Sequence, residues 1–227
     1  MRKNIRSLNN VLAEFEMFRS VLSANRYKPV PFDTAWNATA VAGGTMALNT
    51  FQEARLRSSA TINSSILYRW NPMAGYNVGA APSYFNWSKK SSFFFSISKT
   101  ATDTQAVSRV QFKETNSTTI AVLAERGVGL QLDNLALTGE AYGTSRGTVD
   151  LSTTMTAGQV SRIEIRLTST GVEFFVNNVS KGSITTAGQF PTVIATAECD
   201  GFLTHANGAA GTNTDFYCMQ MAILQEV

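Results

Sequence analysis

Residues 161–186 read SRIEIRLTSTGVEFFVNNVSKGSITT, and this stretch decides the fold. In its first part apolar residues alternate with charged ones: Ile163, Ile165 and Leu167 among Arg162, Glu164 and Arg166. Such alternation is the period of a strand with one buried face and one wet face. Thr170-Gly171 signals a turn before a second alternating run at 172–176, and Asn177-Asn178 tolerates the positive φ of a tight reversal into 179–184. The stretch therefore predicts three consecutive antiparallel strands.

Further candidate strands recur along the chain at intervals of about ten residues, separated mostly by Gly, Asn, Pro and Asp. They cover 46–57, 65–70, 92–98, 106–112, 119–124, 129–133, 148–151, 192–196 and 216–224. Short strands at this spacing are typical of a β-sandwich or barrel. No helical pattern follows residue 26, so we expect an all-β body.

The first 26 residues differ from the rest because their apolar residues fall at helical spacing. We expect one amphipathic helix, whose apolar face needs a partner in the same domain or in another subunit, and the sequence leaves both open. A membrane-surface helix fits less well, since the polar face is not strongly basic. The apolar assembly face comprises Leu8, Val11, Leu12, Phe15, Phe18 and Leu22.

Residues 27–36, YKPVPFDTAW, carry prolines at alternate positions, Pro29 and Pro31. Proline fixes φ and removes a backbone donor, so we expect an extended arm or linker that runs along a surface. We therefore divide the chain into an N-terminal helix and extended arm, residues 1–31, and a β-sandwich domain, residues 32–227.

Composition narrows the classes of partner. Of the 227 residues, 44% are hydrophobic, which is enough for a core, and 15% are charged, which with many Ser and Thr suits a β-rich protein. The net charge of +3 comes mostly from scattered basic residues, whereas a nucleic-acid surface needs clustered Lys and Arg. No run is apolar and long enough to span a membrane. The start MRKN is not followed by an apolar region, so we expect synthesis in a cytoplasm without export by a signal peptide.

The two cysteines, Cys199 and Cys218, lie in apolar, strand-like stretches near the C-terminal end. For a cytoplasmic chain we expect two buried, reduced thiols. A disulfide between neighbouring strands is the alternative, and the spacing permits it.

The segments RIEIRL, GVEFFVNN and GSI, in that order within 162–184, resemble the late-strand hairpin of concanavalin A-like sandwiches. This jelly-roll group includes laminin-G-like modules, legume lectins and β-glucanases. FQEARLRSSATINSSILYRW at 51–70 looks like the outer-strand pair of the same group. The resemblance implies an antiparallel jelly-roll β-sandwich over about residues 45–227. Similar domains occur in phage and other virion proteins, often behind an N-terminal helix or arm.

Catalytic motifs are scarce. The glucanases of this group use an E-x-D-x-x-E strand, because two carboxyl groups must flank the sugar, and no such triplet occurs here. Glu164 stands between basic residues and Glu173 stands alone on its strand. We therefore expect a protein that is not an enzyme.

His205 is the sole histidine, and it lies in a stretch, 203–215, that reads as a long loop. It has no Cys or His neighbours at zinc-site spacing and no nucleophile-elbow motif to serve, so we expect an exposed loop residue. Asp200, Asn207, Asn213 and Asp215 could offer oxygens to calcium, but their spacing fits no calcium loop. We expect no metal and no cofactor.

Aromatic residues gather around a second long loop, 71–84. Flat aromatic faces with polar rims bind sugars, and the same residues anchor subunit interfaces. The group comprises Trp70, Tyr76, Tyr84, Phe85 and Trp87. The hydrophobic core competes for one of the tryptophans and for Phe93, Phe95 and Phe174. Because Phe93-Phe94-Phe95 is consecutive, at least one of these rings must face away from the main core.

These observations favour a virion structural protein, a capsid decoration or tail-associated subunit that acts through protein–protein contacts. We expect a homo-oligomer, a complex with other virion proteins, or both, with no nucleic-acid or membrane partner. The alternative is a lectin-like carbohydrate-binding module that binds a glycan through the aromatic loop at 70–87.

Overall fold

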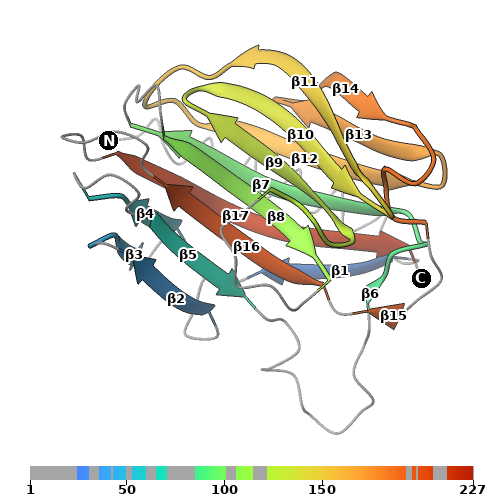
Figure 1. Ribbon diagram of the computed structural model, residues 1–227, viewed down its shortest axis with the longest axis horizontal. Coiled ribbons are helices and arrows are strands. Elements are labelled where there is room, and N and C mark those ends of the chain that lie inside the picture. The colour runs from blue at the N-terminus through green and yellow to red at the C-terminus, as the bar shows by residue number, and fades with distance from the viewer. Residues whose placement is uncertain are drawn as a thin grey trace, which may run out of the picture.

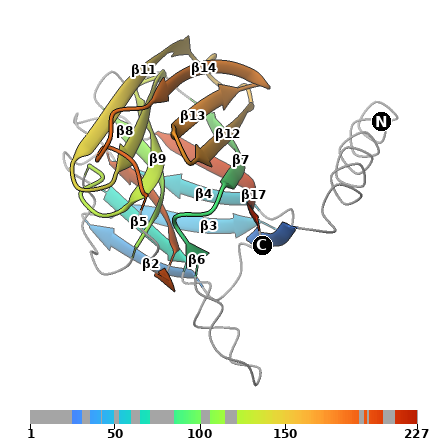
Figure 2. The same cartoon turned by 90° about the vertical axis from the view of Figure 1, so that its right-hand side faces the viewer.

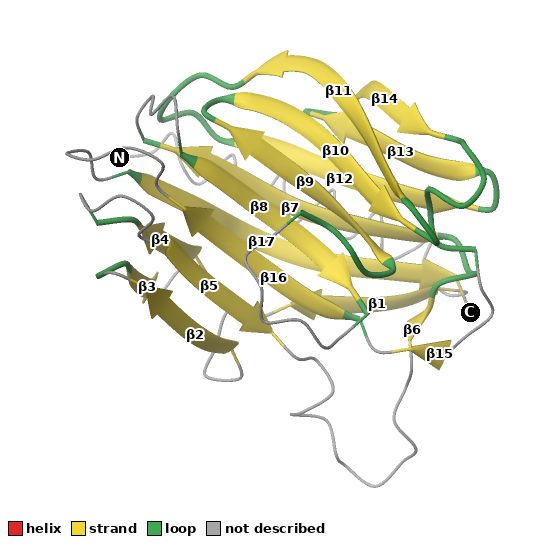
Figure 3. Cartoon of the chain, viewed as in Figure 1, coloured by secondary structure: helices red, strands yellow, loops and turns green. Residues whose placement is uncertain are grey.

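The computed structural model describes residues 25–30, 36–41, 43–49, 53–59, 65–70, 85–100, 106–114, 122–192, 196–197, 199–206 and 214–226. Over these ranges the chain forms strands, turns and loops without a helix (Figure 3). The described residues thus contain no helix of the length and apolarity that a membrane span requires.

Two antiparallel sheets form a sandwich, with the seven-stranded sheet in front in Figure 1 and on the left in Figure 2. The seven-stranded sheet has the order β11 (Arg146–Thr154), β10 (Ala136–Tyr142), β9 (Gly127–Asp133), β8 (Val107–Lys113), β16 (Asp200–Ala206), β5 (Ser65–Trp70) and β2 (Trp36–Val41). The eight-stranded sheet has the order β14 (Val179–Ile184), β13 (Gly171–Val176), β12 (Ser161–Thr168), β7 (Ser91–Lys99), β17 (Asp215–Glu226), β4 (Glu53–Arg57) and β3 (Thr45–Asn49), and β1 (Asn25–Val30) also pairs with β17. Strands β6 (Phe85–Asn86) and β15 (Thr196–Ala197) form a small separate pair.

The three strands expected in 161–186 are confirmed as β12, β13 and β14. Ile163 pairs with Val176 across the first hairpin. In the turn between β13 and β14, Asn177 and Asn178 have φ values of 51° and 66°, the left-handed conformation that Asn tolerates best after Gly. Two successive positive φ values match the right-handed twist of the flanking strands.

The core lies between the two sheets and comes from the alternate residues that point inward. Phe93 of β7 and Phe112 of β8 belong to different sheets, are fully buried, and have ring centroids 4.7 Å apart. Burying a side chain of this size contributes roughly 1.5–3 kcal/mol. Phe95 is also buried, whereas Phe94 between them is half-buried on the opposite face, as the consecutive aromatics predicted.

Some predicted element boundaries are wrong. Residues 46–57 were expected to form one strand, but they contain a hairpin of β3 and β4. The prediction missed the turn because the residues that join the two strands contain no Gly or Pro to mark it. Strands β10 and β16 were not predicted, and the loop expected at 203–215 starts with four strand residues of β16. Residues 122–124 are not strand, although 119–124 was expected to be one.

The expected N-terminal helix face, Leu8 to Leu22, lies outside the described residues. Part of the expected arm does not: β1 covers 25–30 and pairs with 221–226 of β17. The first half of β17 pairs with β4 on the same side. Between the two halves the register shifts and Gln220 has a φ of 54°, so a bulge separates the two neighbours of β17. The domain boundary at residue 31 stays a prediction. Strand β1, which lies on the N-terminal side of that boundary, belongs to the eight-stranded sheet.

Candidate functional site

The structure describes three of the five residues of the predicted aromatic site. Tyr76 and Tyr84 lie outside the described residues, and Trp70 is described by its backbone in β5. Phe85 is half-buried in β6, and its ring meets that of Trp87 edge-on at 4.6 Å. Trp87 is 1% exposed and packs against Phe93 at 6.1 Å. Trp87 is therefore part of the hydrophobic core, as expected for one of the tryptophans, and its ring is not available to a ligand.

The expectation for His205 is wrong. His205 is fully buried on β16 and points between the sheets. Its Nδ1 lies 2.8 Å from Ser108 Oγ of β8, and its Nε2 lies 2.8 Å from Thr214 Oγ1 beside β17. Thr214 in turn contacts Ser58 at the end of β4. Ser108 and His205 are cross-strand partners in the seven-stranded sheet, and the contact with Thr214 links His205 to the other sheet. Since Ser108 is also fully buried, this Ser–His pair cannot meet a substrate.

The structure describes the side chain of one of the four residues considered for calcium, Asp215, and describes Asp200 by its backbone in β16. Asn207 and Asn213 lie outside the described residues. Asp215 accepts hydrogen bonds from Arg55 Nη2 at 2.7 Å and from Arg57 Nε at 2.7 Å, so its carboxylate is engaged. No group of three metal-ligating side chains occurs among the residues that the structure describes.

A set of polar residues, which sequence reasoning missed, lies on the outer side of the seven-stranded sheet. Gln111, Lys113, Glu140 and Thr204 of this set are buried, at 4% exposed or less. In β8 the apolar Val110 and Phe112 point inward, so the residues between them point outward. The register places β9, β10 and β16 residues beside them on the same side. We name this set the outer polar face: Arg109, Gln111 and Lys113 of β8, Gln131 of β9, Glu140 of β10, Arg146 of β11 and Thr204 of β16. The signal in the sequence was the alternation of long polar residues in RVQFK at 109–113.

A segment of the β8–β9 connection lies against this face. Glu140 Oε2 accepts a hydrogen bond from the backbone N–H of Leu123 at 3.2 Å, and Leu123 is 1% exposed. Glu140 also pairs with Arg146 Nη2 at 3.0 Å and is fully buried. Ion pairs of Arg126 with Glu114 and of Lys113 with Glu125 hold the base of the connection. The outer polar face is thus bounded on the β10 side.

Arg109 lies at the centre of the outer polar face. Its Nη2 donates to Gln131 Oε1 at 3.1 Å, while its Nε is buried and has no hydrogen-bond partner among the described residues. Burial lowers the pKa of the Arg109 guanidinium from its ordinary value, and the nearby Glu140 opposes that shift. Thr204 is the cross-strand partner of Arg109, and its Oγ1 is also buried without a partner. Both of these unpartnered atoms are buried, so the part of Arg109 that a ligand can reach is the rest of its half-buried guanidinium.

No protein-family model matches the sequence, and no curated protein matches it. Solved structures match in fold. The endo-β-1,4-glucuronan lyase of the fungus Trichoderma reesei has a TM-score of 0.60 at 12% identity, over 87% of this chain and 94% of that chain. The carbohydrate recognition domain of Emp47p has a TM-score of 0.56 at 12% identity, over 87% of this chain and 90% of that chain. A sialidase matches 88% of this chain with a TM-score of 0.54 at 11% identity, and this chain spans 18% of its length.

The fold is a concanavalin A-like jelly roll. At such low identity the likeness concerns the fold alone, and it confirms the β-sandwich implied by the sequence resemblance. The virion context stays a prediction, since the names of these three structures refer to none.

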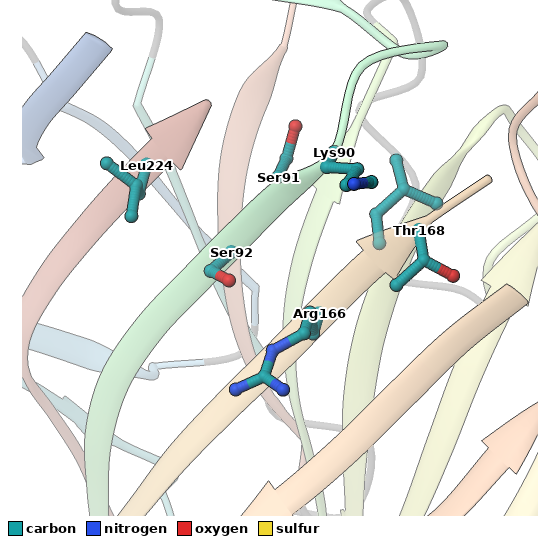
Figure 4. Close-up of a pocket in the computed structure, with 7 residues that line it drawn as sticks. Lys90, Ser91, Ser92, Arg166, Thr168 and Leu224 are labelled. Atoms are coloured by element: carbon teal, nitrogen blue, oxygen red, sulfur yellow. The ribbon is translucent and has the colours of Figure 1, made fainter. Parts of the chain in front are cut away.

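The opposite side of the jelly roll has a shallow open pocket of ≈ 170 Å³ at the ends of β7, β12 and β17 (Figure 4). It is lined by Lys90, Ser91, Ser92, Arg166, Leu167, Thr168 and Leu224. Arg166 contacts Glu164 at 3.0 Å and lies over the ring of Phe175 at 4.4 Å. Because the Arg166 charge already has a counter-ion, this pocket is the weaker candidate for a ligand.

The jelly roll buries both cysteines, and neither forms a disulfide, which agrees with the expectation of two buried thiols. Cys218 is fully buried on β17, and burial raises the pKa of its thiol. Such a thiol is a packing residue and not a nucleophile.

Proposed function

We propose that this protein is a saccharide-binding jelly roll that acts without catalysis, with its ligand on the outer polar face. The observation that carries the proposal is the pair of planar polar side chains Arg109 and Gln131, which are half-buried side by side on the central strands β8 and β9. Planar amide and guanidinium groups form paired hydrogen bonds of fixed direction, which suits recognition of sugar hydroxyls and carboxylates. Strands hold such groups more firmly than loops do.

The names of the structural neighbours support this class of ligand. One acts on glucuronan and another is a carbohydrate recognition domain. The proposal keeps the carbohydrate-binding alternative of the sequence analysis but moves the site from the aromatic loop to the sheet, because Trp87 is buried.

Two engaged side chains support binding without catalysis. His205, the sole histidine of the chain, faces the core and is held by Ser108 and Thr214. Glu140, an acid on the outer polar face, is buried against Arg146 and Leu123. A glycosidase needs two carboxyl groups that reach opposite sides of one glycosidic bond.

The virion structural role, with its homo-oligomer or virion partners, stays a prediction. Its motivating feature, the apolar face between Leu8 and Leu22, lies outside the described residues.

The test is calorimetric titration of the full chain with neutral and acidic oligosaccharides. We expect Gln131→Ala to weaken binding by about tenfold, because it removes a paired amide and releases Arg109. The matched control is Gln159→Ala, since Gln159 is exposed in the connection between β11 and β12. The proposal fails if no oligosaccharide binds, or if Gln131→Ala and Gln159→Ala bind as the unmodified chain does.

A further inference from the structure

The charges on the outer polar face are paired, with one exception among the described residues. Arg146 pairs with Glu140 at 3.0 Å, and Lys113 lies 3.7 Å from Glu125. At the edge of the face, Arg126 pairs with Glu114 at 3.0 Å. Arg109 has no carboxylate partner among the described residues, and its one side-chain contact there is the neutral amide of Gln131.

This arrangement is unfavourable for the protein alone. A cation removed from water needs a counter-ion or a complete set of acceptors. Arg109 is half-buried, its Nε is buried without an acceptor, and Glu140, the nearest carboxylate by its electrostatic effect, is held by Arg146. The guanidinium is thus held in place by Gln131 with donors that remain unused.

We propose that Arg109 binds the carboxylate of an acidic saccharide, so that the ligand class is a uronate and not a neutral sugar. This inference rests on the proposed function of the same face. The planar fork of a guanidinium matches the two oxygens of a carboxylate, and charge-assisted hydrogen bonds of this kind are stronger than neutral ones.

The experiment uses pairs of oligosaccharides that differ only in oxidation at C6. Suitable tetramers are β-1,4-linked glucose and glucuronic acid, β-1,4-linked mannose and mannuronic acid, and α-1,4-linked galactose and galacturonic acid. We expect the full chain to bind at least one acidic member about tenfold or more tightly than its neutral match. We expect Arg109→Gln to abolish that preference, so that the acidic member binds no more tightly than its neutral match.

The control is Arg162→Gln. Arg162 is an exposed arginine on β12, in the other sheet, so its loss tests whether a change of net charge alone reduces binding. We expect Arg162→Gln to keep the full preference for the acidic member. A sulfated neutral tetramer distinguishes the anion: tighter binding of the sulfate than of the uronate overturns the carboxylate assignment.

Stability provides a second readout. Since the unligated protein holds Arg109 without a counter-ion, Arg109→Gln leaves the melting temperature of the unligated chain unchanged or raises it. A fall of several degrees shows a structural role and overturns the inference. Equal affinity for acidic and neutral members also overturns it, while the proposed function stands. Failure of every oligosaccharide to bind the full chain overturns both.

Discussion

At the scale of single residues, His205 makes contacts that hold the two sheets to each other. Its ring nitrogens contact Ser108 in the seven-stranded sheet and Thr214 at the start of β17, and its ring lies near that of Phe216. Each of these groups is buried, so none of them can exchange its partner for water.

We expect His205→Ala to lower the free energy of unfolding by about 2–4 kcal/mol, because it leaves a cavity beside Phe216 and removes the partner of the buried Ser108 hydroxyl, while Thr214 keeps its contact with Ser58. Urea denaturation measures the change. Ser108→Ala, which removes one contact and a small volume, is the control, with an expected loss of about 1–2 kcal/mol. A loss for His205→Ala within about 0.5 kcal/mol would show that the contacts are not stabilising.

The buried thiols give a second prediction at this scale. A thiol reacts as its thiolate, and burial both raises the pKa of Cys218 and blocks reagents. We expect neither Cys199 nor Cys218 to react with a disulfide reagent at neutral pH in the folded protein, and both to react in denaturant. A disulfide would instead give no reactive thiol under either condition.

At the scale of elements, the turn between β13 and β14 decides the register of the last hairpin. Asn177 and Asn178 both have positive φ, and the side chain of Asn177 accepts a hydrogen bond from the backbone of Arg162 at 2.9 Å. The two residues therefore have different roles in one turn.

We expect Asn178→Gly to leave stability unchanged or raise it by up to about 1 kcal/mol, because glycine adopts positive φ without strain. Asn178→Val should lower stability by about 1–2 kcal/mol, since a β-branched residue is strained there. Thermal denaturation of the two variants tests this. Asn177→Gly is the comparison, and it should stabilise less than Asn178→Gly because it loses the contact with Arg162. Equal melting temperatures for the Gly and Val variants at 178 would refute the prediction.

At the scale of the whole molecule, β17 lies beside strands from distant parts of the chain. It pairs with β7 along one side and with β4 and β1 along the other. Strand β1 therefore ties residues near the start of the chain to its last strand.

We expect a chain that starts at Asn25 to keep the stability of the sandwich, whereas one that starts at Phe32 lacks β1 and loses about 2–4 kcal/mol through the lost backbone hydrogen bonds. The freed edge of β17 should also promote self-association. Thermal denaturation with light scattering measures both effects. Equal stability of the two truncated chains would contradict the role given to β1.

Comparing the oligomeric state of the full chain with that of the chain that starts at Asn25 tests the predicted assembly role of the face between Leu8 and Leu22.

The sequence by itself determined which residues form the core and where the last hairpin turns. Alternation in strands has a local period, so it identified the inward Phe93, Phe95 and Phe174 from neighbours two residues away. The double Asn marked a turn by the conformation that its own residues tolerate.

Only the tertiary structure decided what lies beside what. His205 looked like a loop residue because the two hydroxyls that hold it come from other strands, one of them 97 residues away in the sequence. Arg109 became a candidate ligand-binding residue because strand pairing places it beside Gln131 and Thr204, while Glu140 is taken by Arg146. Whether a charge is compensated depends on side chains that long-range pairing brings together, and no local pattern of residues contains that information.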